Sequence, residues 1–486
     1  MNGTLVDPIH AILGLPLLAA AALTLMPSHR MAAKVNILAA FGTFLATTQL
    51  FLHRPEPTAL VFIDDFNIYL VVLTAFVAFT SSMFSADYIQ HEVDIGKLPP
   101  IYLRFYSAMF QLLTFSMLLA LVSNNLGLMW VAVEAATLTT VVMVSVYRTR
   151  EAIEAAWKYF ILASVGIALA LFGTILIYLA AQPVMGPSLE AMAWAAILPH
   201  APQMAPELLN LAFVFLLVGY GTKVGLFPLH AWLPDAHSEG PTPISAVLSG
   251  LLLNVALYAV IRFKMLLAAN GAALSPGPLM IAIGLTSLLF AAVMLYRRRD
   301  IKRLFAYSSI EHMGIVTFAF GMGGPLANFA GLLHMAMHSL TKSAIFFTVG
   351  HIAQVKGTQR MSEIGGLTAS HPWLGWTFVI AVLAIAGLPP FGLFMSEFVL
   401  VTSTFARAPA LAILLVLGLL VAFGAMVLRV QSLAFGAVVG PTEGNTVRLR
   451  LSLLPILVHL GLVLAAGLWL PAPLVAWFQA VARQLG

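Results

Sequence analysis

The chain has 486 residues, of which 61% are hydrophobic and only 9% are charged, and its mean hydropathy is +0.97. Soluble globular proteins carry about 25% charged residues, so this composition excludes a water-soluble enzyme of this length. The absence of cysteine excludes disulfides, thiolate-bound iron–sulfur clusters, cysteine-based zinc sites and thiol nucleophiles. The net charge of +5 does not indicate nucleic-acid binding, because the basic residues lie mostly in short loops between apolar runs.

Apolar runs long enough to cross a membrane follow one another along nearly the whole chain. We therefore predict an all-α, polytopic membrane protein with about 14 transmembrane helices. The predicted spans are 9–27, 32–52, 66–86, 106–122, 125–146, 156–181, 207–230, 242–262, 278–296, 302–321, 327–350, 373–400, 408–436 and 452–478. Seventeen of the 24 lysines and arginines fall in loops after odd-numbered spans and four in loops after even-numbered spans. This asymmetry predicts that the odd-numbered loops are cytoplasmic and that both termini are extracytoplasmic.

Two of the predicted spans are interrupted by glycine and proline. The seventh span contains the interruption 219–228 and the twelfth contains 386–392. Proline removes a backbone donor and clashes with the preceding turn, so both helices should break near the middle of the membrane. Because five helices separate the breaks, we predict two inverted five-helix repeats, formed by helices 4–8 and 9–13. The predicted division is 1–105 for helices 1–3, 106–265 for the first repeat, 266–436 for the second repeat, and 437–486 for helix 14 and the tail.

Ionisable side chains lie where the membrane interior is expected, although each costs about 2.5–3.5 kcal/mol at the bilayer centre. Glu134 lies midway along the fifth span and Lys223 beside the break of the seventh. We interpret them as a functional pair in which the glutamate controls how readily the lysine holds a proton. A static ion pair that fixes helix packing is the alternative. Glu311 and His312 lie near the middle of the tenth span, and Glu397 lies in the second half of the twelfth.

The eleventh span carries His334, His338 and Lys342 at positions i, i+4 and i+8, a single stripe about 12 Å long on one helix face. Imidazole titrates near neutrality, so such a stripe can pass protons with waters between the groups. A zinc site is disfavoured, because no glutamate follows the first histidine as in HExxH and no third ligand is evident. Histidines bonded to backbone or hydroxyl groups are the second alternative. We predict a lateral proton pathway through Glu134, Lys223, Glu311, His312, His334, His338, Lys342 and Glu397, with no cofactor and no metal.

Four segments and the eleventh-span stripe carry a family resemblance. The segments are GTK at 221–223, HAWLPDA at 230–236, EGPTPISA at 239–246 and DIKRLFAYSS at 300–309. Together they resemble the antiporter-like membrane subunits of respiratory complex I, of Mrp antiporters and of energy-converting hydrogenases. The resemblance covers predicted helices 4 to 13. It implies a 14-helix proton channel with inverted repeats in a prokaryotic inner (cytoplasmic) membrane.

Residue by residue, the family's helix-five glutamate falls on Glu134 and its broken-helix lysine on Lys223. The family's helix-eleven polar stripe falls on the stripe described above, and its helix-twelve terminal group on Glu397. Helix eight departs from the family, because Ser249 and Asn254 stand where members carry a titratable histidine or lysine. The resemblance then requires that water, or the Glu311-His312 pair, replaces the missing carrier. That pair and the end of the chain at residue 486 are most similar to component F of hydrogenase-4 and formate hydrogenlyase-type assemblies.

The expected function is a proton-translocating membrane subunit of a respiratory or hydrogenase-type energy-converting complex, with the redox chemistry in partner subunits. Expected partners are other membrane and peripheral subunits, membrane lipid, and protons or Na⁺, with no nucleic acid. The alternatives are a subunit of a multisubunit Na⁺(K⁺)/H⁺ antiporter and a membrane partner of a CO₂-hydrating complex. A quinone-binding or redox subunit is disfavoured, because no cofactor ligands or nucleotide motif occur. A non-transporting scaffold is kept open only by the missing helix-eight base.

Overall fold

The computed structural model describes residues 7–26, 28–99, 103–440 and 452–486. Within these residues the regular secondary structure is helical, joined by loops that make only isolated β-bridges. Each of the 14 predicted spans overlaps at least one helix. By length and composition, nine of the described helices could cross a membrane, or ten if α19 (Leu453–Leu468) and α20 (Ala472–Gln484) form one bent span. The prediction of an all-helical protein with many apolar helices is confirmed.

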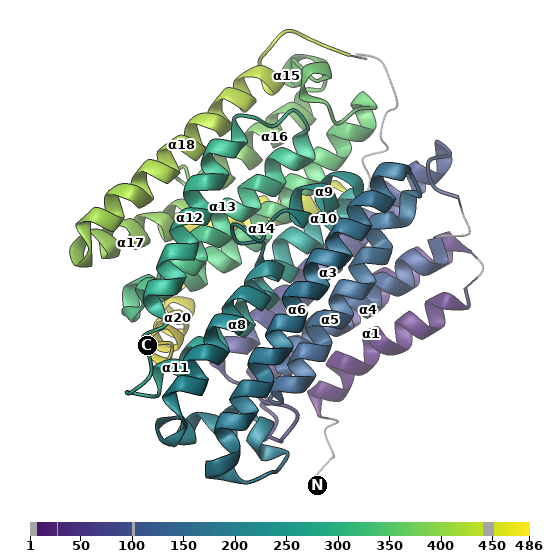
Figure 1. The fold of residues 1–486 in the computed structure, drawn as a ribbon. Helices are drawn as coiled ribbons and strands as arrows, with labels where there is room; N and C mark the ends of the chain where they lie inside the picture. Colours follow the sequence, from purple (N-terminus) through teal and green to yellow (C-terminus); the bar gives the residue numbers. More distant parts are fainter. Residues whose placement is uncertain (1–6, 27, 100–102, 441–451) are drawn as a thin grey trace. The chain divides into compact units, whose positions relative to one another are not determined.

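One compact unit of the fold comprises residues 1–223 and 254–276. Within it α1 contacts α2 and α4, α2 contacts α3, and α5 contacts α4 and α6 (Figure 1). Its helices are α1 (Pro8–Thr24), α2 (His29–Thr48), α3 (Asp65–Asp94), α4 (Leu103–Val122), α5 (Leu126–Val144), α6 (Arg150–Met185), α7 (Trp194–Ile197), α8 (Pro206–Val224) and α11 (Leu253–Ala268).

The second unit comprises residues 224–253 and 277–486 and is built around α14 (Gly324–Lys356). This helix contacts α10, α13, α16, α17, α19 and α20. The other helices of the unit are α9 (Trp232–Glu239), α10 (Thr242–Val247), α12 (Gly277–Leu295), α13 (Ile301–Met322), α15 (Leu367–Ser370), α16 (Pro372–Ile385), α17 (Gly392–Arg407), α18 (Pro409–Ala434), α19 and α20.

Both predicted helix interruptions are present. The helix α8 ends at Val224, and α16 ends at Ile385, seven residues before α17 begins. Each break starts at a glycine with a positive φ angle, +80° at Gly225 and +65° at Gly387. A residue with a Cβ is strained in this left-handed region, so glycine favours these two turns.

The last predicted span, 452–478, is not one straight helix. The axes of α19 and α20 differ by 82° across the short connection that contains Pro471. Proline has no N–H to continue the hydrogen-bond ladder of α19, and it disfavours a helical conformation at the residue before it. The continuous hydrophobicity of this segment therefore concealed a turn.

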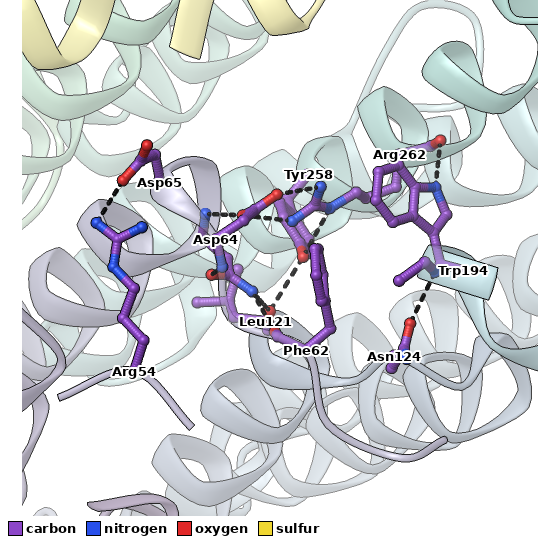
Figure 2. Close-up of polar contacts among 11 residues, drawn as sticks. Arg54, Phe62, Asp64, Asp65, Leu121, Asn124, Trp194, Tyr258 and Arg262 are labelled. Carbon is purple, nitrogen blue, oxygen red and sulfur yellow. Dashed lines mark hydrogen bonds and ion pairs between the residues drawn. The ribbon is translucent and has the colours of Figure 1, made fainter. Parts of the chain in front are cut away.

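An arginine–aspartate pair is buried at the start of α3 (Figure 2). Arg262 on α11 is 2% exposed, and its two terminal nitrogens donate to the two carboxylate oxygens of Asp64, each over 2.7 Å. The guanidinium carbon lies 4.4 Å from the ring centroid of Trp194 and 5.0 Å from that of Tyr258. The sequence pattern ended the eighth span at residue 262, but α11 continues to Ala268 and encloses this side chain.

Asp64 has a second role as the N-cap of α3. One of its carboxylate oxygens accepts from the backbone N–H of Asn67 at 2.9 Å, and the Asn67 side chain accepts in return from the backbone N–H of Asp64. The amide of Asn67 then donates to the backbone oxygen of Leu121 at the end of α4. The capping box therefore fixes the carboxylate that pairs with Arg262 and joins α3, α4 and α11.

Replacing Asp64 with Asn tests this pair. Asparagine still caps the helix, but it leaves the buried guanidinium without a counter-charge, which typically costs about 3–5 kcal/mol. We expect this loss in the free energy of unfolding, measured by denaturant titration of the detergent-solubilised protein.

The matched control is Asp65→Asn at the next position. Asp65 pairs with Arg54, whose side chain is 45% exposed, and pairs of this kind contribute about 0–1 kcal/mol. Equal effects of the two substitutions would contradict the anchoring role of Arg262.

Candidate functional site

Lys223 is fully buried at the end of α8, beside the first helix break. Its ammonium donates to the hydroxyl of Thr137 on α5. It also lies 3.4 Å from the hydroxyl of Tyr159 on α6 and 5.0 Å from the centroid of that ring. The Tyr159 hydroxyl is linked in turn to Thr140 over 2.8 Å. Neutral hydroxyl groups therefore surround the lysine nitrogen in this half of the chain.

Glu134 stands one turn before Thr137 on α5 and interacts electrostatically with Lys223. The two side chains form no direct ion pair within 4.0 Å, and one buried carboxylate oxygen of Glu134 makes no hydrogen bond. The structure thus brings this predicted acid and lysine together, with their charges coupled through the Thr137 turn of α5.

The position of Lys223 depends on close contact between α6 and α8. A Cβ added at Gly219 would lie 2.5 Å from the backbone nitrogen of Ala170 and 2.6 Å from the oxygen of Gly166. Small residues permit such backbone approach between membrane helices. The approach places the end of α8 against α6, where Tyr159 faces Lys223.

The predicted stripe lies on α14, and all three of its side chains are buried. Lys342 donates to the backbone oxygen of Phe305 on α13 at 2.9 Å and interacts electrostatically with Glu311 on the same helix as Phe305. A buried lysine with a neutral acceptor and a nearby acid therefore occurs in the second unit as well. The sequence pattern named both residues without predicting that they face each other.

Three histidine rings lead from Lys342 toward α17. The centroid of His338 lies 5.5 Å from that of His312, and His312 lies 5.1 Å from His334. The Nδ1 atom of His312 and the Nε2 atom of His334 are 3.0 Å apart, a hydrogen bond whose donor depends on the tautomer. The Nδ1 atom of His334 lies 2.9 Å from the hydroxyl of Ser396, next to Glu397.

A cavity of about 320 Å³ lies at the Glu397 end of this series. Both Glu311 and Glu397 line it, together with the loop after α16 and one face of α18. The carboxylate of Glu397 occupies the space that a Cβ at Gly387 would need. The glycine of the second break therefore admits the carboxylate of Glu397 beside it.

Hydroxyl groups that were not predicted continue the polar series from Lys342. Ser249 and Ser309 are joined by a 2.6 Å hydrogen bond, and Ser309 donates to the oxygen of Phe305 that also accepts from Lys342. Ser249 lies in a π-helical turn, Leu248–Leu252, between α10 and α11. Ser249 is therefore hydrogen-bonded into the polar series although it does not titrate. No sequence pattern marks the π turn.

Six of the eight predicted site residues thus meet within the second unit, and the other two meet within the first. The family described as "NADH:quinone oxidoreductase/Mrp antiporter, TM" matches residues 123–424. The chain belongs to this family. As a family member with at least nine helices apolar and long enough to cross a membrane, it is a multi-pass integral membrane protein.

Known relatives support this assignment. The chain is 56% identical over 469 residues to the "Hydrogenase-4 component F homolog" of Methylacidiphilum infernorum, a match that covers 96% of this chain and 98% of the relative. It is 33% identical to a subunit of the Na(+)/H(+) antiporter of Alkalihalophilus pseudofirmus, over 45% of this chain and 44% of the relative.

Solved structures share the fold at low sequence identity. A chain of an archaeal membrane-bound sulfane sulfur reductase has a TM-score of 0.86 at 21% identity, and the match covers 99% of this chain and 98% of the other. A chain of respiratory complex I from Thermus thermophilus has a TM-score of 0.80 at 24% identity, and the match covers 99% of this chain and 100% of the other.

A substitution of Gly219 by Ala tests how Lys223 is positioned. The added methyl group would separate α6 from α8, and overpacking of this kind costs about 1–3 kcal/mol. We expect that loss in denaturant titrations of the purified protein. Gly14→Ala is the control, because a Cβ there meets open space and alanine favours a helix by about 1 kcal/mol. Equal stability of the two variants would contradict the close α6–α8 contact.

Proposed function

We propose that this protein is the proton-translocating membrane subunit of a multisubunit energy-converting complex whose redox chemistry lies in its partner subunits. The observation that carries the proposal is the buried series from Lys342 through three histidines to Glu397. These groups can each gain or lose a proton, and their neighbours are close enough for transfer directly or through one water. The 56% identical relative, named as a hydrogenase-4 component F homolog, supports an assembly of the hydrogenase type.

In the proposed mechanism, Glu134 controls the proton on Lys223. The acid and the lysine interact without a contact ion pair, so a change of charge near Glu134 alters how tightly Lys223 holds its proton. Glu311 acts in the same way on Lys342. A proton released toward His338 then passes through His312 and His334 to Glu397, which exchanges it with the outside.

The energy must come from the partner subunits. Moving one elementary charge against 100 mV costs about 2.3 kcal/mol, and this chain has no predicted redox centre to supply it. Electrostatic coupling along the pairs of acid and lysine provides a physical route from a partner to the transfer groups. Such coupling requires other membrane and peripheral subunits in contact with this one.

The proposed topology completes this mechanism. We place 14 spans in a prokaryotic cytoplasmic membrane with both termini outside, and assign 106–265 and 266–436 to two inverted repeats between helices 1–3 (1–105) and the C-terminal part (437–486). The bias of basic residues toward odd-numbered loops supports the orientation. The two glycine-initiated breaks, at Gly225 and Gly387, support the repeats.

Cation–proton exchange is the second candidate, favoured by the similarity to the Na(+)/H(+) antiporter of Alkalihalophilus pseudofirmus. The same acids and lysines would serve it, so a transport assay must separate the two. Proton uptake that persists without Na⁺ and K⁺ supports the first function. Uptake that requires either cation supports the second.

Lys223→Ala should abolish proton uptake by inverted membrane vesicles that carry the assembled complex. The lysine is the proposed charge carrier of the first unit, and alanine cannot hold a proton. Uptake is measured by quenching of a pH-sensitive dye, and assembly by native gel electrophoresis. Lys264→Ala removes another buried lysine of the same unit and should retain uptake. Full uptake by an assembled Lys223→Ala complex would reject the mechanism.

Ser309→Ala tests the hydroxyl link to Lys342. It removes a hydrogen bond worth about 1 kcal/mol, so we expect proton uptake in the same assay to slow roughly fivefold. Ser308→Ala is a matched control, because the Ser308 hydroxyl is buried at the preceding position without a hydrogen-bond partner. Equal rates for both variants would exclude the serine link from the pathway.

A further inference from the structure

Three side chains at the end of the histidine series form a set that no sequence motif marks. His312, His334 and Glu397 each offer one ligand atom, and these atoms all lie within 4.8 Å of one another. The residues come from α13, α14 and α17, so the set exists only after the helices pack. Two imidazole nitrogens and one carboxylate oxygen are a common ligand set for Zn²⁺.

The ring nitrogens are oriented as ligands require. The Nδ1 atom of His334 is bonded to the hydroxyl of Ser396, which leaves Nε2 directed at His312. A hydrogen bond of this type fixes the ring and the tautomer of a metal-binding histidine. Around one zinc ion at about 2.0–2.2 Å per ligand, ligand atoms lie roughly 3.5 Å apart, so the set must contract by about 1 Å.

Two further observations point to a cation at this place. His312 is 1% exposed, yet its Nε2 makes no hydrogen bond and lies 4.0 Å from an oxygen of Glu311, with the backbone of Ile385 also close. The 320 Å³ cavity reaches the carboxylates of Glu397 and Glu311, which gives an ion a route to the set. The two carboxylates also balance the two positive charges of a divalent ion.

We propose that His312, His334 and Glu397 bind one Zn²⁺ ion, which reaches them through the carboxylate-lined cavity. The nitrogen ligands select against Mg²⁺ and Ca²⁺, which prefer oxygen ligands throughout. A bound ion occupies the lone pairs that proton transfer through this segment requires, so Zn²⁺ stops the transfer. The binding stands on the geometry alone, whereas the block of transfer rests on the proposed function.

Calorimetric titration of the full-length, untagged chain in detergent with ZnCl₂ tests the binding. We expect one ion per chain in the wild type and at least 100-fold weaker binding in His334→Gln and Glu397→Gln. Ser396→Ala should weaken binding roughly 10-fold, because it removes only the hydrogen bond that orients His334. Co²⁺ in place of Zn²⁺ should give the intense visible bands of four-coordinate cobalt in the wild type and lose them in Glu397→Gln.

The control is His459→Gln, which removes a buried histidine of the same unit whose ring faces the backbone of Leu340. It should bind Zn²⁺ like the wild type. Absence of stoichiometric binding to the wild type, or equal binding by Glu397→Gln, would overturn the metal site. Proton uptake by vesicles should fall with Zn²⁺ at the concentration that fills the site. Stoichiometric binding without this fall would leave the metal site standing and count against the proposed proton pathway.

Discussion

The cost of placing ionisable groups among apolar helices governs this structure. A charged side chain in such surroundings is tolerated only if polar groups replace its water. Lys223 meets this requirement with the hydroxyls of Thr137 and Tyr159, and Lys342 with the backbone oxygen of Phe305. Both lysines therefore have neutral acceptors in contact and an acid at greater range. This arrangement holds a proton without making its release prohibitive, as a contact ion pair would.

Arg262 shows what the alternative looks like in the same unit as Lys223. It is held by two charge-assisted hydrogen bonds to Asp64 and enclosed by aromatic rings. A guanidinium does not lose its proton in proteins, and a bidentate pair fixes its geometry. The fold thus uses a contact pair where it needs an anchor, and loosely coupled pairs where the proposed function needs a change of charge.

The sequence predicted what depends on one helix and missed what depends on several. Residue spacing was sufficient for the stripe on α14, because the i, i+4, i+8 relation is local. Glycine and proline likewise marked both breaks. The hydrogen bond between His312 and His334 depends on packing between α13 and α14, and the neighbourhood of Glu397 on the position of α17. The π turn that holds Ser249 has no compositional signal, and hydrophobicity alone did not reveal the turn between α19 and α20.

The second break explains why polar groups gather beside it. Gly387 has no side chain, and the carboxylate of Glu397 occupies the space that a Cβ would fill. Irregular backbone at membrane depth is tolerated only where protein or a polar cavity satisfies it. The break therefore makes room for Glu397, and the cavity beside it reaches Glu311. Proton transfer and metal binding require the same property, which is lone pairs of several residues directed at one point. A site that meets the first requirement in a buried, carboxylate-lined segment therefore meets the second as well.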